Sequence, residues 1–113
     1  MTIGLDMMGG DYAPTEAVKG VKLFFDTISS SVHLALIGEE TQIQPLLQQE
    51  GIDNSRYSII HASQVIGMHE HPTKALKEKQ HSSIAIGFHL LHNKKIDAFI
   101  SAGNTGAMMV GAL

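Results

Sequence analysis

A glycine-containing turn at residues 101–106 offers the clearest chemistry in this sequence. It reads Ser-Ala-Gly-Asn-Thr-Gly, follows an apolar run at residues 96–100 and precedes a run of small residues at 107–113. A strand-to-helix turn presents backbone N–H groups at the positive end of a helix, and Gly103 and Gly106 have no Cβ to keep an anion away. The turn therefore favours phosphate binding, although it also fits a tight connection whose glycines only ease packing.

A second glycine turn follows the first apolar segment, residues 2–6. Asp6 ends that segment, and Gly9 and Gly10 stand beside Asp11 in the turn. Both aspartates are candidates for a general base or for anchoring the turn, and either one fits equally well as a helix cap. The paired glycines would let this turn approach a ligand closely.

Residues 65–83 contain a further cluster of polar side chains. Three lysines, Lys74, Lys77 and Lys79, stand near Ser82 and Ser83. Cations and hydroxyls in this arrangement suit a phosphate, whereas the alternative for the lysines is a solvated helix face. His69, Glu70 and His71 do not make a convincing metal site, because residues two apart diverge on a helix and no third ligand follows at fixed spacing.

Composition excludes several functional classes. The 113 residues, 43% hydrophobic and 17% charged, suffice for one modest core. A net charge of −3 and scattered lysines argue against a broad nucleic-acid surface, and the lack of cysteine excludes disulfides and a cysteine nucleophile. The sequence has neither a G-x-S-x-G elbow nor a P-loop, and no apolar run approaches the length of a membrane span. We expect a soluble, cytoplasmic protein.

Apolar segments alternate with helical segments along the chain. Strands are predicted at residues 2–6, 33–37, 57–62 and 96–100. Helices are predicted after Pro14, from near Glu40, over residues 73–79 and after Ser82 or Ser83. The alternation predicts βαβ units, a mostly parallel sheet and a ligand site at the carboxyl ends of the strands, where both glycine turns lie.

The first predicted helix has the strongest pattern. Ala17, Val21, Phe24 and Ile28 recur at spacings of four, three and four residues, which predicts an apolar stripe facing the sheet. The three serines at residues 29–31 are expected to end this helix.

Three ordered segments of the chain resemble the bacterial phosphate acyltransferase family of phospholipid synthesis. They are residues 3–14, residues 65–83, and Ser-Ala-Gly-Asn-Thr-Gly-Ala at 101–107. The first reads Ile-Gly-Leu-Asp-Met-Met-Gly-Gly-Asp-Tyr-Ala-Pro, and the second matches at Val-Ile-Gly-Met, Pro72, Ala75-Leu76 and residues 79–83. Two positions depart from the family, which often has Asp in place of His69 and Arg in place of Lys77.

The resemblance implies an enzyme that transfers a long-chain acyl group from acyl carrier protein to inorganic phosphate. The acyl phosphate product would serve glycerol-3-phosphate acylation by a downstream acyltransferase. The implied fold is a three-layer α/β/α, Rossmann-like arrangement similar to isocitrate dehydrogenase and phosphotransacetylase, in a homodimer whose chain is much longer than this one. Residues 1–113 would then be the truncated, N-terminal part of a single α/β domain, with no cofactor and with peripheral membrane contact.

Phosphate attack on a thioester needs a held dianion beside a developing oxyanion, and it needs no protein nucleophile. On this chemistry our hypothesis gives catalytic roles to Asn104, Lys79 and Asp6. It gives phosphate binding to Gly9, Gly10, Asp11, Ser83, Ser101, Gly103, Thr105 and Gly106. The alternative is a non-catalytic α/β module that binds a phosphorylated small molecule or a partner protein.

Overall fold

The computed structural model describes residues 1–28 and 31–113 and contains a parallel sheet. Within these residues the sheet has four strands in the order β3-β2-β1-β4. The strands are β1 (Thr2–Asp6), β2 (His33–Gly38), β3 (Tyr57–His61) and β4 (Ala98–Ile100). All four point the same way, so their carboxyl ends meet at one edge, as the sequence predicted.

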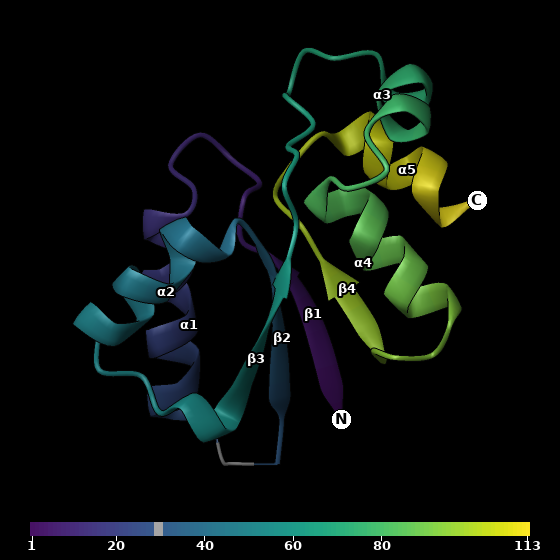
Figure 1. Cartoon of the computed structure of the whole chain (residues 1–113). Coiled ribbons are helices and arrows are strands. Elements are labelled where there is room, and N and C mark those ends of the chain that lie inside the picture. The colour runs from purple at the N-terminus through teal and green to yellow at the C-terminus, as the bar shows by residue number, and fades with distance from the viewer. Residues whose placement is uncertain (29–30) are drawn as a thin grey trace.

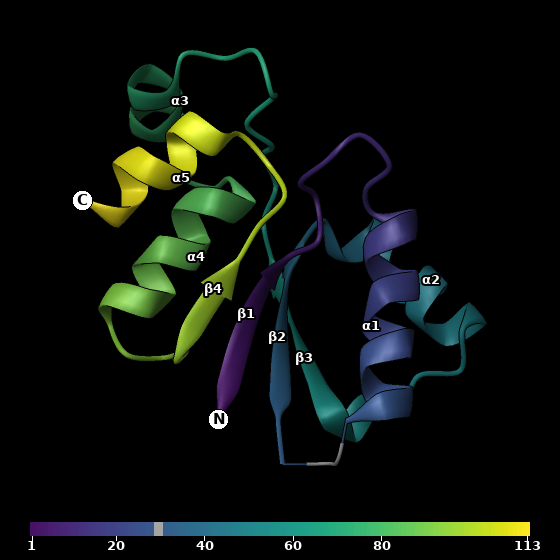
Figure 2. The ribbon, with the colours of Figure 1, turned by 180° about the vertical axis from the view of Figure 1, so that it is seen from behind.

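Helices cover both faces of the sheet (Figure 1). One face carries α1 (Thr15–Thr27) and α2 (Glu40–Gln49), and the other carries α4 (Ser83–His92), with α3 (Pro72–Glu78) and α5 (Thr105–Ala112) near its upper end. A short 3₁₀ helix, Asn54–Arg56, leads into β3. Figure 2 shows the same separation from behind. The chain therefore forms the three-layer α/β/α arrangement that was predicted.

Two apolar clusters hold the layers together. The larger lies between the sheet and the pair α1 and α2, and its buried members are Met7, Val18, Val21, Phe25, Leu34, Leu36, Ile43 and Leu47. The smaller joins α3, α4 and α5 to the loop after β3, and its buried members are Ile66, Ala75, Ile84 and Ala107. Because a fully buried isoleucine contributes about 1.5–3 kcal/mol, Ile66 and Ile84 hold the smaller cluster together, and Ala107 packs α5 against it.

The inward face of α1 differs in part from the predicted stripe. Val21 is buried as expected, but the other buried positions are Val18 and Phe25. Ala17 and Phe24 are partly buried and pack against the same cluster, whereas Ile28, which follows the last helical residue, is 42% exposed. The stripe at spacings of three and four is real, but its register is set by packing on β1 and β2. The predicted stop at Ser29 and Ser30 lies outside the described residues.

The other elements follow the prediction closely. α2 begins at Glu40 and contains Pro45, and Gly51 after it has the left-handed φ of +66° that suits a glycine. β4 is shorter than the predicted strand, yet Asp97 still bonds to the start of β1 through its backbone N–H and its carboxylate. Within the described part of the chain, no helix is long and apolar enough to cross a membrane.

Candidate functional site

The two glycine turns touch each other at the carboxyl edge of the sheet. They follow β1 and β4, which are paired neighbours with Leu5 opposite Ile100. A Cβ added at Gly9 would lie 2.7 Å from the backbone N and 3.0 Å from the Cα of Gly103. Both contacts are with backbone atoms, which cannot move aside by changing a side-chain rotamer. The close approach of the two turns therefore requires glycine at position 9.

Asp6 links the two turns from below. Its Oδ2 accepts a hydrogen bond from the Ser101 hydroxyl at 2.7 Å, and its Oδ1 accepts from the backbone N–H of Met8 at 2.9 Å. The Ser101 oxygen in turn accepts from the N–H of Gly103 at 2.9 Å. Asp6 is only 4% exposed, and both of its oxygens are occupied. These contacts are those of an anchor, one of the three roles that the sequence left open for Asp6.

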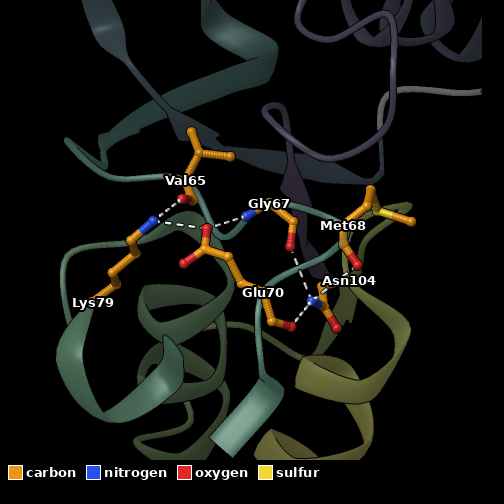
Figure 3. Close-up of polar contacts among 6 residues, drawn as sticks. All are labelled: Val65, Gly67, Met68, Glu70, Lys79 and Asn104. Carbon is orange, nitrogen blue, oxygen red and sulfur yellow. Dashed lines mark hydrogen bonds and ion pairs between the residues drawn. The ribbon is translucent and has the colours of Figure 1, made fainter. Parts of the chain in front are cut away.

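Asn104 caps α5 and also holds the loop that follows β3 (Figure 3). Its Oδ1 accepts from the N–H of Ala107 at 3.0 Å. Its Nδ2 lies 3.0 Å from the carbonyl oxygens of Gly67 and Glu70 and 3.5 Å from that of Met68. The side chain is 4% exposed, so its amide is engaged on both sides.

Lys79 contacts the same loop from the far end of α3 (Figure 3). Its Nζ donates to the Glu70 carboxylate at 2.7 Å and to the carbonyl oxygen of Val65 at 3.0 Å. The Glu70 oxygen also accepts from the N–H of Gly67 at 2.6 Å. The Lys79 ammonium, and then the Gly67 N–H, hold the pKa of the Glu70 carboxyl below its ordinary value.

The start of α5 carries donors suited to an anion. Within residues 1–28 and 31–113, the backbone N–H groups of Thr105 and Gly106 form no hydrogen bond. Thr105 is exposed. Gly106 packs so closely against α3 that a Cβ at this position would collide with Pro72. The first turn of α5 therefore offers unpaired donors at the positive end of its dipole.

The remaining predicted residues lie around the same edge. Gly10 has a φ of +92°, and Asp11 beside it is exposed. Ser83 is the first residue of α4 and is 2% exposed, while its neighbour Ser82 caps the helix by accepting from the N–H of Ala85.

An apolar cavity of about 500 Å³ opens beside the first glycine turn. It lies between α1 and the strands β1 and β4, and its lining includes Ile3, Leu5, Phe24, Ile100, Gly9 and Gly10. Ligand pockets in proteins are commonly about 300–1,000 Å³ and mostly apolar, so this cavity has the size and lining of a ligand site.

Sequence reasoning placed Asn104 and Lys79 at this edge but missed Glu70 as their common neighbour. Glu70 drew attention only as a metal ligand between two histidines, and among the described residues no group of three His, Asp or Glu is arranged to hold a metal ion. Its carboxylate accepts a hydrogen bond from Lys79, which lies nine residues later at the other end of α3. No sequence pattern predicts a contact at this spacing.

Comparison with known proteins gives consistent matches over the whole chain. A family model described as "Fatty acid synthesis protein" matches residues 1–113. Proteins named phosphate acyltransferase from Dictyoglomus turgidum and Acetivibrio thermocellus are 49% and 46% identical to the chain, and each alignment covers 100% of this chain and 33% of the relative. A third, from Caldanaerobacter subterraneus, is 42% identical over 100% of this chain and 32% of its own. The chain spans about a third of the length of these curated relatives.

Proposed function

The chain belongs to the fatty acid synthesis protein family, and from this premise we propose that the complete protein transfers a long-chain acyl group from acyl carrier protein to inorganic phosphate. The product would be an acyl phosphate destined for phosphatidic acid. The relatives' name, phosphate acyltransferase, supports the transfer to phosphate. The three motifs that resemble the phosphate acyltransferases of phospholipid synthesis support the choice of acyl donor and product.

The observation that carries the proposal is the union of the two glycine turns through Asp6, Ser101 and Gly103. This link holds the start of α5 against the first turn, so the unpaired N–H groups of Thr105 and Gly106 have fixed positions. A phosphate dianion bound there would gain hydrogen bonds and a favourable helix dipole without any rearrangement of the backbone.

In the reaction that we propose, a phosphate oxygen attacks the thioester carbonyl carbon and forms a tetrahedral oxyanion. The C–S bond then breaks, and the carrier protein leaves as a thiolate that takes up a proton. Fixed donors lower the barrier because they hold the dianion in line with the carbonyl and need no reorganisation as charge develops. Lys79 and Ser83 flank this edge from α3 and α4, and no side chain needs to form a covalent intermediate.

The apolar cavity beside Gly9 and Gly10 supports the acyl half of the proposal. Its lining combines Gly9 and Gly10 of the first turn with aliphatic and aromatic side chains of the sheet and α1. An acyl chain lying along these side chains, with its carbonyl toward Gly9 and Gly10, would hold the thioester beside the glycine turns.

The partners and location follow as parts of the same proposal. We propose that the complete protein is a cytoplasmic homodimer that touches the membrane peripherally. Its acyl phosphate product would pass to a glycerol-3-phosphate acyltransferase, because a mixed anhydride is a strong acyl donor for a hydroxyl group.

The test is acyl phosphate formation from palmitoyl acyl carrier protein and phosphate, with hydroxylamine trapping of the product. The protein from the complete reading frame is compared with residues 1–113 alone. Product from the complete protein supports the proposal, and its absence from residues 1–113 would show that later residues complete the site. If both proteins are folded and neither gives product, the acyltransferase proposal fails and a phosphate-binding module becomes the better account.

A further inference from the structure

We propose that Glu70 is a positioning residue that sets the phosphate affinity of the site by holding the loop of residues 65–71 against Asn104. The inference rests on the proposed function, and it goes further by giving a role to a carboxylate that does not itself touch phosphate. It also assigns Lys79 and Asn104 to the same hydrogen-bonded unit (Figure 3).

The first link of this unit closes the loop on itself. A single oxygen of Glu70 accepts from the Lys79 ammonium at 2.7 Å and from the Gly67 N–H at 2.6 Å. Lys79 also donates to the carbonyl oxygen of Val65 at 3.0 Å. Charge-assisted hydrogen bonds of this length are stronger than neutral ones, so the ion pair defines the path of the loop between Val65 and Glu70.

The second link passes from the loop to α5. An amide nitrogen has two hydrogens, so the carbonyl oxygens of Gly67 and Glu70, each 3.0 Å from Asn104 Nδ2, are its natural acceptors. With Nδ2 held by the loop, Oδ1 is turned toward the N–H of Ala107, which it caps at 3.0 Å. The loop therefore determines the orientation of the residue that begins α5.

Exposure distinguishes this role from simple stabilisation of the fold. The Glu70 and Lys79 side chains are 37% and 33% exposed, and an ion pair this open to solvent adds little to global stability. Asn104, in contrast, is 4% exposed and directly precedes the unpaired N–H groups of Thr105 and Gly106. Loss of the ion pair should leave the protein folded while the start of α5 becomes less well ordered.

The experiment compares Glu70→Gln with Glu78→Gln in the protein from the complete reading frame. Glutamine keeps the size and an acceptor oxygen of Glu70 but removes its charge. Glu78 is an exposed carboxylate at the end of α3, next to Lys79 in sequence, so it controls for the loss of one negative charge in this region. The measurements are the Michaelis constant for phosphate, turnover at saturating phosphate, and amide hydrogen exchange at residues 67–70.

For Glu70→Gln we expect the Michaelis constant for phosphate to rise about fivefold, which is the upper scale of an ion pair this exposed. Turnover should change by less than about threefold, because the phosphate once bound reorders the turn. Exchange at residues 67–70 should become faster, and Glu78→Gln should match the unmutated protein in all three measurements. Lys79→Gln should raise the Michaelis constant at least as much, because it also removes the donation to the Val65 carbonyl oxygen, and the double variant should be no worse than Lys79→Gln alone.

Two results would overturn the inference while the proposed function stands. One is acyl phosphate formation with an unchanged phosphate Michaelis constant in Glu70→Gln. The other is an equal rise in the phosphate Michaelis constant in Glu78→Gln, which would show that loss of any negative charge in this region has the same effect. Failure of the proposed function is recognised separately: the unmutated protein would then form no acyl phosphate, and the positioning role would fall with it even if exchange at the loop became faster.

Discussion

Replacing Gly9 with alanine tests whether contact between the two glycine turns matters. The new methyl carbon would lie 2.7 Å from the backbone N of Gly103 and 2.8 Å from Oδ2 of Asp6. Both distances are well inside the 3.4 Å at which ordinary contacts begin. Neither neighbour can move freely, because Gly103 is backbone and Asp6 is held by Ser101 and Met8. The turns must therefore separate.

The expected cost has two parts. Forcing an extra methyl group into a packed position destabilises proteins by about 1–3 kcal/mol, and we expect that loss in the free energy of unfolding. Moving Gly103 also strains its 2.9 Å hydrogen bond to Ser101 and displaces the start of α5. Because a misplacement of about 1 Å can cost about a hundredfold in rate, we expect kcat/KM for phosphate to fall by about that factor.

Gly20→Ala is the matched control for the free energy of unfolding; because Gly20 also lines the apolar cavity, it is not used as a control for the kinetics. Gly20 lies within α1, and a Cβ there would meet no atom within 4 Å. Alanine is a better helix former, so this variant should be more stable by about 0.5–1 kcal/mol. Urea unfolding and initial rates at varied phosphate, both on the complete protein, measure the two effects. If Gly9→Ala retains normal stability and phosphate kinetics, the contact between the turns has no functional role.

Three further predictions concern the surroundings of these turns. Asn104→Asp should keep the cap on α5 but place a carboxylate oxygen against the carbonyl oxygens of Gly67 and Glu70. We expect this to lower the free energy of unfolding by about 2–4 kcal/mol and to cripple the use of phosphate. Normal turnover with an unchanged Michaelis constant for phosphate would contradict this prediction. Arg56→Ala should lower the free energy of unfolding, measured by thermal unfolding, by about 1–3 kcal/mol. The guanidinium carbon lies 4.2 Å from the centroid of the Phe25 ring, and the group donates to two carbonyl oxygens at the end of α1. An unchanged melting temperature would show that these contacts do not stabilise the fold. The pKa of Glu70 is lowered in the folded protein from its ordinary 4.5. The carboxylate should therefore stabilise the loop fully above pH 4.5, and this stabilisation should be lost as the pH falls through the lowered pKa. Amide exchange at residues 67–70, corrected with Glu70→Gln as the reference, should become faster over this range, and no such change would refute the prediction.

The sequence was sufficient for features set by local order. Strand, glycine turn and helix follow one another at residues 2–27 and again at 98–112, and parallel pairing of β1 with β4 brings the two turns together. The start of α4 at Ser82 was also predictable, because helix capping depends on neighbouring residues.

Contacts between distant segments could not be predicted in the same way. Asn104 donates to carbonyl groups more than thirty residues earlier in the chain. The sequence motif that suggested phosphate binding at Asn104 could not predict this contact. The stripe of α1 was predicted only in part for a related reason: both Ala17 and Val18 are apolar and both contact the core, and only packing against the sheet decides which of them is fully buried. The phosphate-binding roles of the predicted residues remain predictions.

The most direct test of the central claim is a crystal structure of the complete protein with bound phosphate. We predict an anion within hydrogen-bonding distance of the backbone N–H groups of Thr105 and Gly106, facing the turn at Gly9 and Gly10. An anion bound elsewhere, with this edge of the sheet empty at a phosphate concentration that saturates the reaction, would contradict the account.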